Sequence, residues 1–194
     1  RGLGDVYKRQ HSRYDLFAGS LSIERNSLDY KQYPISGRKQ FLVAQYVTGT
    51  EKYMPSPITD MGSFDRKVHS WLQMKGEWEQ YKTISPYFNL GFMSELVLSS
   101  KNLMNNYTAS VLQAPAFTPT PHSQIVFNEA FRANQYVAFG LSPILKFSKL
   151  LHFRLDMYGF APLYEIKKEE VWNNNTYTAI PYYVKFLHSF KYMG

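Results

Sequence analysis

Hydrophobic and polar residues alternate with a period of two along most of the chain beyond Gln10. The clearest example lies within residues 68–81, where Leu72, Met74 and Trp78 alternate with residues such as Lys75 and Glu77. Because successive side chains of a strand point to opposite faces, this period predicts strands and not helices. Seven segments are predicted as strands: 16–30, 41–48, 68–81, 87–99, 135–146, 151–164 and 176–188. The chain is therefore predicted to be all-β.

The length of these segments indicates the kind of sheet. Most run for roughly ten to fourteen residues, whereas strands of soluble proteins usually have about five or six and a tilted transmembrane strand needs about nine to eleven. Tyrosines lie near the predicted strand ends, as in the aromatic girdles of membrane barrels: Tyr30, Tyr33, Tyr46, Tyr81, Tyr87, Tyr158, Tyr164, Tyr182 and Tyr183. We predict an antiparallel transmembrane β-barrel. The alternative is a soluble antiparallel sandwich with one solvent-exposed face, which has the same two-residue period of hydrophobicity.

The connections between the strands should alternate between the two sides of the membrane. The short connections 31–37, 82–86 and 147–150 are predicted on the periplasmic side, and 50–67 and 165–175 outside. This works only if residues 101–134 hold no complete spanning strand or an even number of them. Because prolines cluster at 115, 119 and 121, the segment is predicted as one long loop, external or folded into the lumen. An open edge facing lipid would leave backbone groups unpaired. We therefore expect the seven strands to be an incomplete part of a larger barrel.

The first ten residues differ in character from the remainder of the chain. The string Gly-Leu-Gly-Asp-Val-Tyr-Lys-Arg-Gln at residues 2–10 resembles a translated sequencing-adapter scar, so residues 1–10 are interpreted as a non-native leader and 11–194 as one barrel domain. The leader holds three of the 22 basic residues and one of the 15 acidic ones, and the basic excess that remains is ordinary. No basic stripe is interleaved with aromatic residues, so no nucleic-acid partner is predicted. The aromatic content of 17% then stands as the main compositional signal.

Three motifs resemble those of a known superfamily. Tyr33-Pro34-Ile35-Ser36-Gly37 resembles the Pro-x-x-Gly turn of the BamA-type, or bacterial surface antigen, barrel superfamily. Phe131-Arg132-Ala133-Asn134 is similar to the motif on its lumenal loop, and Leu155-Asp156-Met157-Tyr158-Gly159 is similar to the acid-bearing strand one hairpin later. The runs 112–123, 131–134 and 136–140 look closest to the C-terminal barrel of outer-membrane patatin-like phospholipases. Ala133-Asn134 replaces the Gly-aromatic pair of the assembly factors, which favours the patatin branch.

The resemblance implies a barrel of about 16 strands in the bacterial outer membrane. Its partners would be outer-membrane lipid and the protein's own upstream passenger domain, a lipid acyl hydrolase. It also implies that Arg132 meets Asp156 inside the barrel, and the strand alternation independently places Asp156 on the lumen face. We predict a salt bridge between Arg132 and Asp156, and a periplasmic turn formed by Tyr33, Pro34 and Gly37.

Catalytic and metal-binding motifs are absent from the sequence. A patatin hydrolase needs a Gly-x-Ser-x-Gly elbow and an Asp-Gly acid, and neither occurs, so hydrolysis would belong to a domain upstream. With no cysteine, and with no histidine pair at metal-ligand spacing among His11, His69, His122, His152 and His188, no metal or cofactor is predicted. Glu77 and Glu79 share a strand face with Lys75 and are interpreted as a solvated lumen wall.

The predicted function is an outer-membrane barrel that anchors, displays or translocates a patatin-like passenger. The alternatives are a barrel of an assembly or secretion factor and a soluble β-sandwich binding module.

Overall fold

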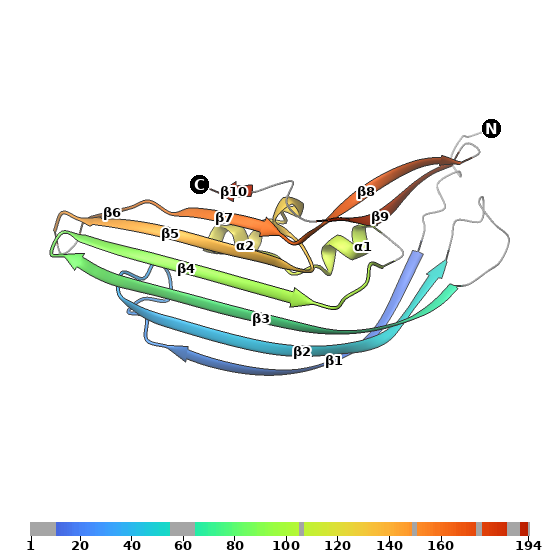
Figure 1. Cartoon of the computed structure of the whole chain (residues 1–194), viewed down its shortest axis with the longest axis horizontal. Coiled ribbons are helices and arrows are strands. Elements are labelled where there is room, and N and C mark those ends of the chain that lie inside the picture. The colour runs from blue at the N-terminus through green and yellow to red at the C-terminus, as the bar shows by residue number, and fades with distance from the viewer. Residues whose placement is uncertain are drawn as a thin grey trace, which may run out of the picture.

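The computed structural model describes residues 11–54, 65–104, 107–148, 151–173, 176–185 and 191–193. Eight strands form one antiparallel sheet: β1 (His11–Asn26), β2 (Gly37–Met54), β3 (Asp65–Ser85), β4 (Phe88–Ser99), β5 (Tyr136–Lys146), β6 (His152–Arg154), β7 (Met157–Pro162) and β10 (Lys191–Met193). Its order is β1-β2-β3-β4-β5-β7-β10, with β6 also paired to β5 (Figure 1). Strands β8 (Tyr164–Asn173) and β9 (Thr176–Lys185) pair in a separate hairpin. The all-β, antiparallel prediction is confirmed.

The predicted strand positions hold well through β5 and less well after it. The segment predicted at 151–164 is divided into β6 and β7 at Leu155 and Asp156. The segment 165–175, predicted as an outside loop, instead contains most of β8, whose backbone pairs in register with β9. That prediction was wrong because a run of Lys and Glu has no alternation to indicate a strand. The predicted leader, residues 1–10, lies outside the described residues.

Residues 101–134 form the long connection between β4 and β5, here called the covering loop. Its described part contains no strand; it holds α1 (Tyr107–Leu112), α2 (Pro121–Ile125) and the short 3-10 helix η1 (Glu129–Phe131). Helix α2 begins at a capping box, in which Thr120 Oγ1 accepts from the backbone N–H of Ser123 at 3.1 Å. The prediction of a loop without a spanning strand is confirmed for the described residues.

The register of the sheet separates apolar and polar side chains onto two faces. One row runs across six strands through Ile23, Leu42, Gly76, Leu96, Val137 and Ala161. The next row, on the opposite face, runs through Glu24, Phe41, Glu77, Glu95, Ala138 and Phe160. We call these the apolar face and the polar face. Directly paired residues project to the same side of a sheet, so each face is continuous across all six strands.

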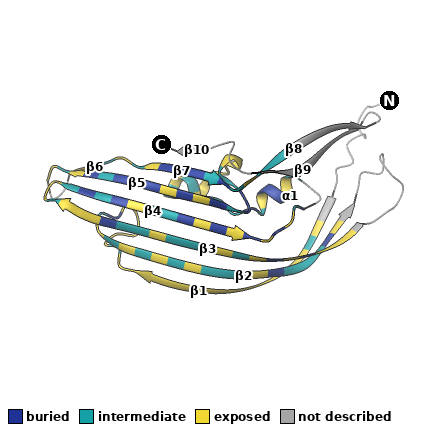
Figure 2. Cartoon of the chain, in the orientation of Figure 1, coloured by how far each residue is buried: buried dark blue, intermediate teal, exposed yellow. Residues whose placement is uncertain are grey.

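In this sheet the apolar side chains are exposed and several polar side chains are buried, which is the reverse of the arrangement in a soluble domain. On the apolar face the large hydrophobic residues are exposed to a third or more of their surface: Phe17, Leu21, Ile23, Leu42, Val68, Leu72, Met74, Trp78, Phe92, Leu96, Leu98, Val137, Phe139, Leu141 and Met157. On the polar face, Glu51, His69, Asn89, Glu95 and Ser142 are buried. Figure 2 shows this alternation of buried and exposed positions along β4 and β5.

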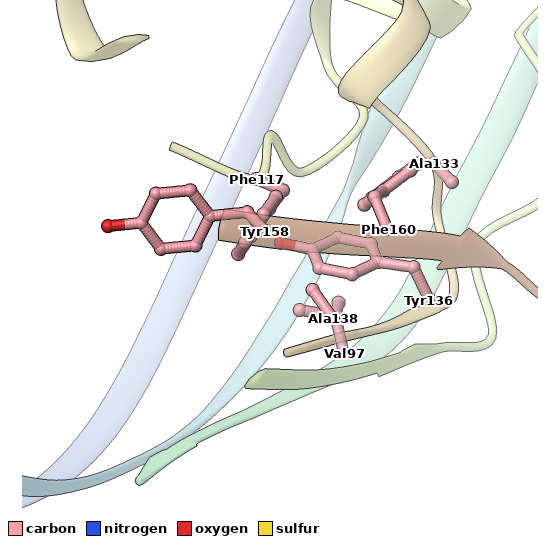
Figure 3. Close-up of a cluster of buried hydrophobic side chains, with 7 residues drawn as sticks. All are labelled: Val97, Phe117, Ala133, Tyr136, Ala138, Tyr158 and Phe160. Atoms are coloured by element: carbon pink, nitrogen blue, oxygen red, sulfur yellow. The ribbon is translucent and has the colours of Figure 1, made fainter. Parts of the chain in front are cut away.

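The covering loop is held to the polar face by an aromatic cluster. Phe117 of the loop stacks against Phe160 of β7 with ring centroids 6.0 Å apart, and Tyr136 of β5 lies 4.9 Å from Phe160 (Figure 3). Phe131 adds an edge contact to Phe160 at 5.6 Å. Such pairs contribute about 0.5–1.5 kcal/mol each beyond the area that they bury. The loop is thereby fixed over β5 and β7.

Tyrosine side chains do not all occupy the girdle positions predicted from the sequence. Tyr81 and Tyr158 are buried on the polar face, whereas Tyr30, Tyr33, Tyr46, Tyr87 and Tyr164 are exposed. The girdle prediction was therefore wrong for Tyr81 and Tyr158. Nearness to a strand end does not decide the face, because the face changes with every residue.

Candidate functional site

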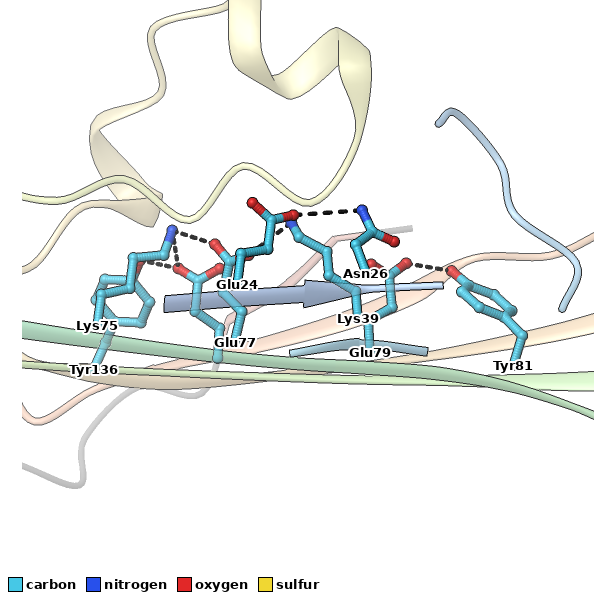
Figure 4. Close-up of polar contacts among 9 residues, drawn as sticks. Glu24, Asn26, Lys39, Lys75, Glu77, Glu79, Tyr81 and Tyr136 are labelled. Atoms are coloured by element: carbon cyan, nitrogen blue, oxygen red, sulfur yellow. Dashed lines mark hydrogen bonds and ion pairs between the residues drawn. The ribbon is translucent and has the colours of Figure 1, made fainter. Parts of the chain in front are cut away.

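A network of charged side chains lines the middle of the polar face. Lys75 Nζ lies 2.7 Å from Glu77 Oε1 and 3.2 Å from Glu95 Oε1, and Lys39 Nζ lies 3.0 Å from Glu77 Oε2. The hydroxyl of Tyr136 donates a hydrogen bond to Glu95. Figure 4 shows Lys39, Lys75 and the carboxylates on one side of the sheet, beneath the covering loop. Lys75 and Glu77 thus belong to an ion-pair network that carries both charge signs.

A cavity of about 850 Å³ lies beside this network. Its wall combines polar-face residues with the covering loop and the β1–β2 turn, including Glu24, Glu79, Glu95, Tyr81, Arg154 and Thr120. Glu79 accepts a hydrogen bond from the Tyr81 hydroxyl at 2.7 Å, and Glu24 accepts one from Asn26 Nδ2 at 3.4 Å. Within the described residues, Glu24 and Glu79 take part in none of the ion pairs. The cavity is therefore a polar, water-compatible space with charges of both signs.

Arg154 contacts three parts of the molecule around this cavity: Asp156, strand β3 and the turn between β1 and β2. Its Nε lies 2.7 Å from Asp156 Oδ1. Its Nη2 donates to the Tyr81 hydroxyl at 2.9 Å, and its guanidinium carbon lies 5.2 Å from the centre of the Tyr81 ring. Its Nη1 donates to the carbonyl of Pro34 at 2.7 Å. Only a planar fork with several N–H donors can serve all these acceptors at once.

The predicted salt bridge between Arg132 and Asp156 does not occur among the described residues. Arg132 Nη1 donates instead to the carbonyls of Leu112 and Ala114, both at 3.0 Å, and its guanidinium stacks on Phe127. Arg132 therefore holds the covering loop together from within. Asp156 is paired with Arg154, which lies two residues earlier on the same face and reaches the carboxylate without crossing the cavity.

Asp156 does lie toward the polar face, as the alternation predicted. The hydroxyl of Ser142, a buried polar-face residue of β5, donates to Asp156 Oδ1 at 2.5 Å. A serine beside a carboxylate resembles a hydrolytic pair. Here the carboxylate is already paired with a guanidinium and the serine is buried, so the contact is structural. Sequence reasoning missed Arg154. It could have been found because it lies two residues before Asp156 and therefore on the same face of the strand.

The predicted turn is formed by the expected residues. Gly37 has φ +103°, and a Cβ there would lie 2.2 Å from the carbonyl oxygen of Ser27. Tyr33 also has a positive φ, 54°, which was not predicted. Pro34 is buried, and the carbonyl of Ile35 accepts a hydrogen bond from Asn89 Nδ2 at 2.7 Å. The turn therefore folds back over the polar face, where Arg154 and Asn89 hold it.

Asp29 fixes the shape of this turn. Its Oδ1 accepts from the backbone N–H groups of Tyr30, Ile35 and Ser36 at 3.0, 3.0 and 3.2 Å. Partial burial acts to raise the pKa of the Asp29 carboxyl, but the hydrogen bonds from Ser36, Ile35 and Tyr30 together outweigh it and leave that pKa lowered. The turn therefore favours the ionised carboxylate.

A second buried polar group lies near the other end of β2 and β3. Glu51 Oε2 and His69 Nε2 are 2.8 Å apart, and Tyr14 donates its hydroxyl hydrogen to Glu51 Oε1 at 3.0 Å. Both side chains of the pair are almost fully buried. No group of three or more metal-ligating residues is found in the described part of the chain. The Glu51–His69 pair therefore holds two strands together at this end.

Lys101 begins the covering loop beside this pair. Its Nζ donates to the carbonyl of Gln113 at 3.1 Å and lies 5.1 Å from the ring centre of Trp71. Burial lowers the pKa of the Lys101 ammonium to about 8. The cation is stabilised by a carbonyl and an aromatic face, and it anchors the loop to β3.

None of the described helices has the length and apolar character needed to cross a membrane. Comparisons of the chain with protein-family models, with curated proteins and with solved structures gave no match.

Proposed function

We propose that residues 11–194 are part of an outer-membrane β-barrel. In this proposal the apolar face contacts lipid, and the polar face and the covering loop line the barrel interior. The barrel would anchor, display or translocate a patatin-like lipid acyl hydrolase domain that is not in this chain. The observation that supports the proposal best is the exposed apolar face, which lies opposite a buried, charged face.

Solvent exposure of this face would be unusual for a soluble protein. Soluble monomers rarely expose contiguous apolar patches larger than a few hundred Å², and here the exposed apolar residues continue across β1 to β7. A soluble sandwich would bury that face and hydrate the charged one. Membrane barrels have the opposite arrangement, with apolar side chains outward and polar side chains inward.

The height of the apolar band also fits a membrane. On β3 the band extends from Val68 to Trp78, ten residues along the strand. At about 3.4 Å per residue this is about 34 Å, and a strand tilt of about 40° reduces it to roughly 26 Å along the membrane normal, close to the apolar band of about 25 Å in such barrels. Charged side chains lie beyond both ends, at Arg66 and Lys82.

The passenger is proposed from the resemblance of residues 112–123, 131–134 and 136–140 to patatin-like barrels. The complete reading frame tests this part directly. A Gly-x-Ser-x-Gly domain preceding residue 11 supports the passenger, whereas tandem small α/β repeats in that place would overturn it and leave the anchor intact.

The anchor is tested by fractionation and by cysteine labelling of the intact protein in cell membranes. We expect recovery in the outer-membrane fraction after carbonate washing, with heat-dependent gel migration. Because the chain has no cysteine, single variants Leu72→Cys, Gln73→Cys, Met74→Cys and Lys75→Cys can be compared without background. A membrane-impermeant maleimide that can enter the pore should label positions 73 and 75 and spare 72 and 74. Recovery in the soluble fraction, or efficient labelling of 72 and 74, would overturn the proposal.

A further inference from the structure

Three basic residues stand side by side at one end of the apolar face. Arg13 of β1 pairs in register with Lys52 of β2, and Lys52 pairs with Arg66 of β3. All three are exposed. We call Arg13, Lys52 and Arg66 the cationic row. Directly opposed residues have Cβ atoms about 4.5–5.5 Å apart, so the Cβ atoms of the three basic residues fall within about 11 Å.

The position of the row relates it to the apolar band. Strand β4 begins to pair with β3 only at Gln73, so the row lies on the part of β1 to β3 that extends past β4 (Figure 1). Val68, Leu72 and Phe17 come next on the same face, and Phe17 and Val68 are 75% and 70% exposed. The row therefore lies two residues along each strand beyond the first residue of the apolar band, which is Val68 on β3. This step corresponds to about 7 Å.

The arrangement is not explained by the stability of the sheet. Like charges directly opposite one another destabilise a strand pair. One carboxylate, Asp15, lies on the same face one residue pair below, 3.5 Å from Arg13 Nε. It can offset one charge of the row, so among the described residues the row keeps two positive charges in excess.

We propose that the cationic row binds the phosphate of an anionic phospholipid, whose acyl chains lie along Phe17, Val68 and Leu72. This rests on the proposed membrane location and deepens it. The ligand must combine a phosphate with apolar chains, because the charges adjoin exposed aromatic and aliphatic side chains. Arginine and lysine are the usual phosphate ligands.

The test measures lipid bound to the intact, detergent-purified protein by native mass spectrometry, with phosphatidylglycerol as the probe and phosphatidylcholine as the neutral comparison. The variant Lys52→Gln/Arg66→Gln removes two neighbouring charges. The variant Lys31→Gln/Lys82→Gln is matched in charge, since it removes two exposed lysines at the other end that are not paired with each other. At about 1 kcal/mol per basic residue, the first variant should bind phosphatidylglycerol roughly 30-fold more weakly, and the second within about twofold of wild type.

The outcomes separate this inference from the proposed function. Equal losses in both variants would mean non-specific attraction and would overturn the inference, as would no loss in either. Displacement of the lipid by millimolar inorganic phosphate would show a site for the free anion and would also overturn it. If the protein is recovered in membranes but Lys52→Gln/Arg66→Gln binds lipid as wild type does, only this inference is overturned. If the protein is recovered in the soluble fraction, the proposed function is overturned first.

Discussion

Arg154 donates a hydrogen bond from Nη1 to the carbonyl oxygen of Pro34 at 2.7 Å, although 120 positions separate the two residues. The same guanidinium pairs with Asp156. Replacing it by methionine leaves the half-buried Asp156 carboxylate without its cation and the turn without its donor. We expect Arg154→Met to lower the free energy of unfolding in urea by about 2–3 kcal/mol, and Arg154→Lys by less, because the charge remains while the fork is lost.

The control for this substitution is Arg25→Met, at an exposed position of β1, which should be nearly neutral. Trypsin should also cleave after Lys31 faster in Arg154→Met, because the turn is no longer held to the polar face. Equal urea midpoints for Arg154→Met and wild type would contradict this role.

Gly37 is predicted to be intolerant of any side chain. Its φ of +103° opposes alanine, and so does the Ser27 carbonyl oxygen, which lies 2.2 Å from the position that a Cβ would take. Gly37→Ala should lower the unfolding free energy by more than about 1 kcal/mol. Gly19→Ala is the matched control, since nothing lies within 4 Å of its Cβ position. Loss of stability in Gly19→Ala but not in Gly37→Ala would reverse this account of the turn.

The buried Glu51–His69 pair should show strong non-additivity. His69→Leu removes the imidazole from a carboxylate that is fully buried, and we expect a loss of about 3–5 kcal/mol in unfolding free energy. The double variant Glu51→Leu/His69→Leu should be more stable than His69→Leu, because both desolvated polar groups are gone. A double-mutant cycle measured at pH 7 checks this, and simple addition of the two single losses would contradict it.

Asp29 should make the turn sensitive to acid. Its folded-state pKa lies below the ordinary value of 3.8, so the carboxylate adds stability at pH values above about 4, and that stability is lost as the pH falls through the folded-state pKa. Urea unfolding at pH 7 and at pH 3 should therefore differ less in Asp29→Asn than in wild type. The same pH dependence in both proteins would show that Asp29 does not contribute.

The period of two was enough to predict β1 to β5 and their faces, because it depends only on local geometry. It placed Asp156 toward the polar face for the same reason, whereas the Pro-x-x-Gly motif placed Gly37 at a turn. Arg132 was assigned as the partner of Asp156 from the family resemblance, whereas the actual partner, Arg154, lies two residues before Asp156 on the same face. The strand at 164–173 was missed because Lys167, Lys168, Glu169 and Glu170 do not alternate with apolar residues.

The order of the sheet has a consequence for how the chain assembles. From β1 to β4 each strand pairs with the next along the chain, so these pairings have low contact order and can form by successive hairpin closure. Adding β5 is different, because the covering loop must first be closed, at an entropic cost that grows with its length. We therefore expect the four N-terminal strands to pair early, β5 to join across the main kinetic barrier, and the Arg154–Pro34 hydrogen bond to form last, as a marker that folding is complete.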